Sequence, residues 1–181
     1  GFALRRSAFV PMDPAIGEDC IVPLDVVSHG MLVVHDPEAV HYDEFETDTG
    51  VTLRRRVRMT LRNWQGTWRR SHLLNPCRHP GYAFALWSHK ILRWLSPVFL
   101  MAATISSVSL LLLQFSILRL LLAAPWTALF LAAAFHLLFE RRRRLLPGTG
   151  AAYSFVLANT AFIIGVAKAL AGWQIRAYRN T

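Results

Sequence analysis

Acidic residues are almost absent from this chain after residue 48. Ten of the eleven carboxylates fall in the first 48 residues, and the stretch from Thr49 to Trp94 has none, although it carries nine arginines and one lysine. Soluble domains mix both signs of charge with about 45–50% apolar residues. The sequence therefore divides into a charged head, residues 1–94, and an apolar part, residues 95–181, which has the composition of a membrane protein.

Cysteine is scarce as well. Cys20 and Cys77 are the only two and are not in a Cys-x-x-Cys spacing, which argues against a zinc site or a disulfide framework. We expect both thiols to be reduced. His29, His35 and His41 recur every six residues, a spacing that fits neither one helix face nor a zinc motif. No metal site is therefore expected within this chain. A Ser-His-Asp arrangement and a Gly-rich phosphate loop are also missing.

The head has the pattern of an α/β fragment. Gly17 ends a proline-containing loop that leads to the acidic pair Glu18-Asp19. Acids suit a helix start, because the first N–H groups are unpaired and the helix dipole favours negative charge. The helix is predicted over residues 20–28, with Gly30 as a left-handed cap. Apolar and β-branched composition predicts short strands over residues 2–6, 31–35 and 39–42.

Residues 52–95 are predicted to form basic helices at a membrane surface. The first helix, residues 52–68, carries an apolar stripe surrounded by arginines, the pattern of an interfacial helix. The second covers residues 82–94, with Trp87 and Trp94 suited to the headgroup level. The stripe consists of Leu53, Val57, Leu61, Trp64 and Trp68.

The apolar run from Leu95 to Phe139 is too long for one membrane span, since about 20 residues cross the hydrocarbon core. Gln114, Ser116 and Arg119 provide the break. We expect a transmembrane region over residues 96–173, followed by a tail, residues 174–181. Its three spans are predicted near residues 96–115, 120–139 and 151–173.

Charge sets the expected orientation of these spans. Four consecutive arginines, Arg141 to Arg144, lie between the second and third spans, and short arginine-rich loops face the cytoplasm. With three spans, the head and this loop are cytoplasmic and the tail lies outside. Arg176 and Arg179 in the tail oppose that arrangement.

Two groups of side chains could carry chemistry. Glu18-Asp19 could supply a general base, or be a solvated helix start. The arginines of residues 54–58 could bind a pyrophosphate through their guanidinium forks, or contact anionic lipid. Nucleic acid is not expected as a partner, because the basic cluster adjoins a membrane anchor.

The order and spacing of several head motifs resemble the second half of a family-2 glycosyltransferase domain. These motifs are Leu4 to Phe9, Gly17-Glu18-Asp19, Gly30 and Val34 to Val40. Members are inverting enzymes with a GT-A fold and include cellulose and hyaluronan synthases. The resemblance implies that residues 1–51 are the acceptor-side part of the domain. It also implies that Asp19 is the catalytic base, with Glu18 beside it.

Membrane-bound members carry Gln-x-x-Arg-Trp on an interfacial helix further along the chain. Here Arg55 replaces the Gln, Arg58 matches, and Met59 replaces the Trp that stacks on the acceptor sugar. Trp64 is a candidate substitute for that stacking. The arginine-rich version resembles capsular and exopolysaccharide glycosyltransferases, as does the segment from Ser88 to Pro97. The resemblance assigns diphosphate binding to Arg55 and Arg58, and positioning of donor or acceptor to Arg5 and Arg6.

The resemblance implies a hexosyltransferase-type enzyme of the bacterial inner membrane. It would transfer a sugar from a nucleotide-sugar donor to a polysaccharide or lipid-linked acceptor. The Mg²⁺ or Mn²⁺ of the family is held by an Asp-x-Asp motif, which this sequence lacks.

The sequence also begins without an initiator methionine or a signal region. We therefore expect a C-terminal portion that is inactive without a preceding donor-binding half. The alternative is a non-catalytic membrane assembly partner that binds anionic lipid through its arginines.

Overall fold

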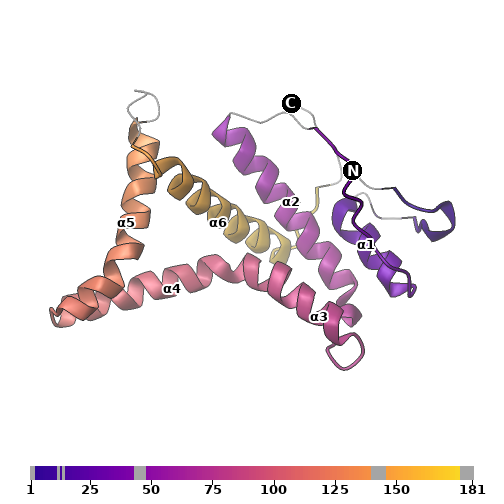
Figure 1. The fold of residues 1–181 in the computed structure, drawn as a ribbon, viewed down its shortest axis with the longest axis horizontal. Coiled ribbons are helices and arrows are strands. Elements are labelled where there is room, and N and C mark those ends of the chain that lie inside the picture. Colours follow the sequence, from indigo (N-terminus) through magenta and orange to yellow (C-terminus); the bar gives the residue numbers. More distant parts are fainter. Residues whose placement is uncertain (1–2, 12, 14, 43–47, 140–145, 176–181) are drawn as a thin grey trace. The chain divides into compact units, whose positions relative to one another are not determined.

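The computed structural model describes residues 3–11, 13, 15–42, 48–139 and 146–175. Within these ranges every regular element is a helix and no strand forms (Figure 1). In chain order the elements are η1 (Arg6–Ala8), α1 (Glu18–Ser28), α2 (Thr49–Arg69), η2 (Ser71–Leu74), α3 (Pro80–Leu86), η3 (Trp87–Ile91), α4 (Leu92–Leu113), α5 (Ile117–Phe139) and α6 (Thr149–Leu170).

The predicted α/β fold is therefore wrong for the described residues. Residues 31–35 and 39–42 form no strand, and their apolar side chains face outward: Leu32 is 86% exposed and Tyr42 is 89% exposed. Residues 3–6 form no strand either, and residue 2 lies outside the described residues. A strand is stabilised by pairing with a neighbour, and β-branched composition does not supply that neighbour.

Helix α1 confirms the prediction from local residues. It begins at Glu18, with Asp19 also in its first turn, and ends at Ser28. Gly30 follows with a φ of 73°, the left-handed conformation that glycine adopts without steric cost. The helix start and its cap are thus both determined by short-range chemistry.

Helix α2 is amphipathic, but the middle of its apolar stripe is covered by protein. Asp48 caps it, with Oδ1 accepting a hydrogen bond of 2.8 Å from the Val51 N–H. Val57, Leu61 and Trp64 are buried, whereas Trp68 is 44% exposed. The stripe therefore serves packing within the protein over most of its length.

The chain divides into two compact units, residues 1–93 with 164–181 and residues 94–163. In the first unit α1 packs on α2 (Figure 1). Gly66 permits the close approach, because a Cβ there would lie 2.9 Å from Ile16 Cγ2. At the other end of α1, the buried Asp25 carboxylate accepts a 2.5 Å hydrogen bond from Arg70 Nε. Both ends of α1 are thus attached to α2 or to the residue that follows it.

Among the described residues, three helical runs are long and apolar enough to cross a bilayer, which indicates a multi-pass membrane protein. They are Pro80–Leu113, which contains α3, η3 and α4, then Ile117–Phe139 and Thr149–Leu170. In the second unit, α4 and α5 are separated at residues 114–116, where the break was expected. Arg119 Nη1 closes this turn by donating to the Leu110 and Gln114 carbonyls at 3.2 and 2.9 Å. The arginine loop and the tail arginines lie outside the described residues.

Candidate functional site

The start of α1 and one face of α2 enclose a small cleft of about 70 Å³ in the first unit. It contains four residues predicted from sequence as site residues: Glu18, Asp19, Arg55 and Arg58. The remaining lining residues are Gly17, Met59, Arg62 and Asn63. We call this the carboxylate–arginine cleft.

Close packing at the start of α1 positions the carboxylates. A Cβ on Gly17 would collide with Asn63 Oδ1, so glycine lets the chain pass directly against α2. The buried Arg62 donates from Nη2 to the Ile16 carbonyl at 2.7 Å. These contacts hold the first turn of α1, and hence Asp19, beside the arginine face of α2.

Arg62 was not among the sequence candidates, although helical spacing could have identified it. Arg55, Arg58 and Arg62 stand at i, i+3 and i+7, which places them on one face of a helix. Arg55 is exposed, Arg58 is half-buried and Arg62 is buried. Exposure of the three cleft-lining arginines therefore falls from Arg55 to Arg62.

The cleft combines two types of chemistry. Glu18 and Asp19 are exposed in the first turn of α1, so their oxygens are accessible to a hydroxyl group from solvent. Arg55 and Arg58 lie opposite, on α2. A carboxylate in reach of a hydroxyl can accept its proton, and guanidinium groups stabilise phosphate oxygens. The cleft can thus bind a phosphate group beside a general base.

Arg5 and Arg6 do not join this cleft. Both are exposed and lie at the start of η1, and neither lines the pocket. The structure therefore separates them from the other predicted residues.

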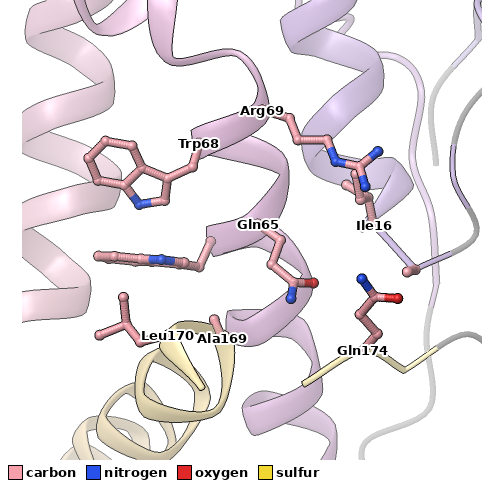
Figure 2. Close-up of a pocket in the computed structure, with 9 residues that line it drawn as sticks. Ile16, Gln65, Trp68, Arg69, Ala169, Leu170 and Gln174 are labelled. Carbon is pink, nitrogen blue, oxygen red and sulfur yellow. The ribbon is translucent and has the colours of Figure 1, made fainter. Parts of the chain in front are cut away.

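Trp64 also lies elsewhere. It follows Arg62 by two residues, about 200° further around the helix, and lines a second pocket of about 470 Å³. Figure 2 shows this pocket. Its ring centroid is 5.7 Å from that of Trp68. We call this the tryptophan pocket. Its lining residues are Ala15, Ile16, Trp64, Gln65, Trp68, Arg69, Ala169, Leu170 and Gln174.

Polar contacts join the elements around the tryptophan pocket. Arg69 Nη2 donates to Asp13 Oδ2 at 2.9 Å, and Gln65 Nε2 donates to the Trp173 carbonyl at 2.7 Å. Figure 2 shows Gln65 and Gln174 pointing toward one another, while Trp68 projects from the opposite side of α2. The pocket therefore brings α2 together with the end of α6.

No group of three or more His, Cys, Asp or Glu side chains among the described residues could hold a metal ion. His29 Nδ1 lies 2.7 Å from the Asp25 carbonyl, at the end of α1. His35 and His41 are exposed in the extended segment that follows. Both cysteines are free: Cys20 is buried and Cys77 is exposed.

The geometry thus groups the predicted base and diphosphate-binding residues in one cleft and leaves Arg5, Arg6 and Trp64 outside it. That cleft is the candidate functional site, and its chemistry is defined by two carboxylates and three guanidinium groups. No protein-family model, curated protein or solved structure matches this chain.

Proposed function

We propose that this chain is the acceptor-side and membrane-anchoring part of an inverting glycosyltransferase. The enzyme would move a sugar from a nucleotide-sugar donor to a polysaccharide or lipid-linked acceptor. One observation carries the proposal: Asp19 and Arg55, which are 36 residues apart in sequence, line the same cleft. A base and a diphosphate-binding group are the two functions that such a transfer needs on adjoining surfaces.

In the proposed reaction Asp19 acts on the acceptor. A carboxylate oxygen takes the proton from the acceptor hydroxyl while the hydroxyl oxygen bonds to the anomeric carbon. The bond between that carbon and the diphosphate oxygen breaks on the opposite face, so the configuration inverts. Arg55 and Arg58 stabilise the negative charge on the departing nucleoside diphosphate.

The resemblance also implies Mg²⁺ or Mn²⁺. The described residues do not provide a ligand set for it, since the cleft contains only the carboxylates of Glu18 and Asp19 and no larger group of metal ligands is present in that part of the chain. No step of the proposed reaction is therefore assigned to a metal. In the proposal, donor and metal binding belong to parts of the enzyme outside this chain.

The proposal places the cleft on the cytoplasmic face of a bacterial inner membrane. Three apolar helical runs support membrane anchoring. The arginines of α2 and of the loop between α5 and α6 support the cytoplasmic side, by the positive-inside rule.

The decisive experiment compares the wild type with two variants of the full-length protein in isolated membranes, using a panel of radiolabelled nucleotide sugars. We expect the wild type to transfer sugar from one donor and Asp19→Asn to lose transfer. Asp36→Asn is the matched control, because Asp36 is exposed in a turn, accepts a hydrogen bond from the Glu38 N–H at 3.0 Å, and lies outside the cleft.

Equal transfer by Asp19→Asn and wild type would remove Asp19 as the base, and Glu18→Gln would then test its neighbour. If no donor supports transfer by the wild type, the non-catalytic reading is favoured, in which the arginines of α2 bind anionic lipid. In that case Arg-to-Lys substitutions on α2 should leave membrane association unchanged.

A further inference from the structure

The two ends of the membrane region meet in one compact unit. Residues 1–93, which precede the apolar part of the chain, and residues 164–181, which end it, form the first unit together. At the first end, Lys90 lies two residues before α4, and its Nζ donates to Cys20 Sγ of α1 at 3.0 Å. The chain thus enters α4 from a point attached to α1.

At the second end, α6 crosses α2 at close range at Gly165. A Cβ on Gly165 would lie 2.6 Å from Thr60 Cβ and 3.0 Å from the Val57 carbonyl oxygen, so the two helix backbones are in close contact there. Eight residues later, the Trp173 carbonyl accepts the hydrogen bond from Gln65. The tryptophan pocket lies along the same surface (Figure 2).

This surface of α2 belongs outside the hydrocarbon core. Arg55 and Arg58 line the carboxylate–arginine cleft on α2, and Arg69 is paired with Asp13 beside the tryptophan pocket. A charged side chain at the centre of a membrane is costly, and α2 carries several. Helix α2 with its arginines and the carboxylates around it therefore remains in water or at the headgroup level. The end of α6 and Trp173 after it must lie there too, because Gly165 and Trp173 contact α2.

Contact between the two ends restricts how many times the chain can cross. If α4, α5 and α6 each crossed once, the number of crossings would be odd and the end of α6 would lie on the far side from α2. The contact of α6 with α2 places both ends of the membrane region on one side of the bilayer, so the number of crossings must be even. By length and composition all three helices are candidate membrane spans. With both ends of the membrane region on one side, however, at most two of the three can cross.

We infer that α4 and α5 cross the bilayer and that α6 does not: its last turns dock on α2, on the side of the membrane that holds α1 and α2. Charge selects this pair. With α4 and α5 crossing, the α2 arginines, Arg141 to Arg144, and the tail residues Arg176 and Arg179 all lie on one side, as the positive-inside rule requires. Either other pair would place the four-arginine loop opposite α2.

Contacts of α6 agree with a location at the interface. In the second unit, Asn159 in the middle of α6 accepts a 2.8 Å hydrogen bond from Ser96, which lies in the first turns of α4. Near the end of α6, Lys168 Nζ lies 4.9 Å from the centroid of the Trp173 ring. Tryptophan and lysine are residues that anchor helices at the headgroup level.

Site-directed cysteine labelling tests this topology in the full-length protein. The exposed Cys77 reports the side of α1 and α2. Three cysteines are each introduced into a Cys77→Ser background, with any further exposed cysteines replaced by serine. They are Phe115→Cys in the turn between α4 and α5, Leu146→Cys at the exposed position before α6, and Asn180→Cys in the tail. A membrane-impermeant maleimide is applied to sealed inside-out and right-side-out vesicles, and labelling after detergent solubilisation shows that each thiol can react.

We expect Cys77, Leu146→Cys and Asn180→Cys to be labelled in the same vesicle orientation and Phe115→Cys to be labelled only in the opposite one. Labelling of Leu146→Cys and Asn180→Cys in opposite orientations would show that α6 crosses, and would overturn the inference. Labelling of Phe115→Cys in the orientation of Cys77 would also overturn it, since α4 would then not cross. The readout needs no enzymatic activity, so it is independent of the glycosyltransferase proposal.

Discussion

Arg56 and Arg58 are close neighbours on α2 but have different surroundings. Arg58 is half-buried and lines the carboxylate–arginine cleft, whereas Arg56 is exposed and does not line it. We predict that Arg58→Ala lowers kcat by about 10²-fold, or ~2–3 kcal/mol of transition-state stabilisation, by analogy with the loss of one oxyanion donor. Arg56→Ala should leave kcat unchanged. Initial rates of sugar transfer in membranes measure both.

A second substitution at residue 58 separates phosphate recognition from simple charge. Arg58→Lys keeps the positive charge but loses the planar fork that binds two oxygens at once. We expect it to restore little of the rate. Full activity in Arg58→Lys, or equal losses in Arg56→Ala and Arg58→Ala, would mean that only the total charge on α2 matters.

Helix contacts give a prediction at the scale of elements. Gly165 on α6 lies against Thr60 and the Val57 carbonyl of α2, so a larger side chain at residue 165 must push α6 away from α2. We expect Gly165→Leu to destabilise the protein by about 1–3 kcal/mol, the usual cost of overpacking. Ala167→Leu is the control, since Ala167 is exposed on the same helix. Thermal unfolding in detergent compares them, and equal melting temperatures would contradict the α2–α6 contact.

Elements with local determinants were predictable from the sequence, and elements with distant ones were not. The acidic start of α1 and its cap at Gly30 depend on neighbouring residues, and both are confirmed. The segment over residues 31–35 has strand composition, but a strand also needs a pairing partner, and none forms among the described residues. Composition alone could not show that residues 31–35 lack the pairing partner that a strand needs.

The same division applies to the candidate site. Asp19 and Arg58 were selected from the sequence because the family resemblance assigned them the roles of base and diphosphate-binding residue, and the structure places both in one cleft. Trp64 was selected for its aromatic ring alone. Its position depends on how α2 is rotated against its neighbours, and that rotation turns it toward α6. A sequence pattern contains no information on that rotation beyond the apolar stripe.

For the molecule as a whole, the apolar surface of the second unit determines its partition between water and lipid. Leu112, Leu121 and Leu131 on α4 and α5 are 81%, 65% and 71% exposed, respectively, and burying one leucine side chain contributes roughly 1.5–3 kcal/mol. We predict that the protein stays in the membrane pellet after washing with 1 M salt (about a 3 Å screening length) and alkaline carbonate. Release by salt alone would mean that the arginines of α2, and not inserted helices, attach it.

Attachment of α1 at both ends has a consequence for ligand binding. Arg62 holds the carbonyl before its first turn, and Arg70 holds Asp25 near its last. Asp19 therefore lies on a helix that is fixed at both ends, and the orientation of this helix is set during folding. In the proposed reaction, little entropy is then lost in arranging the base, and more of the acceptor's binding free energy is available for orienting its hydroxyl. The rate of sugar transfer would therefore fall if α1 moved by a fraction of an ångström, even in a variant that keeps every side chain of the cleft.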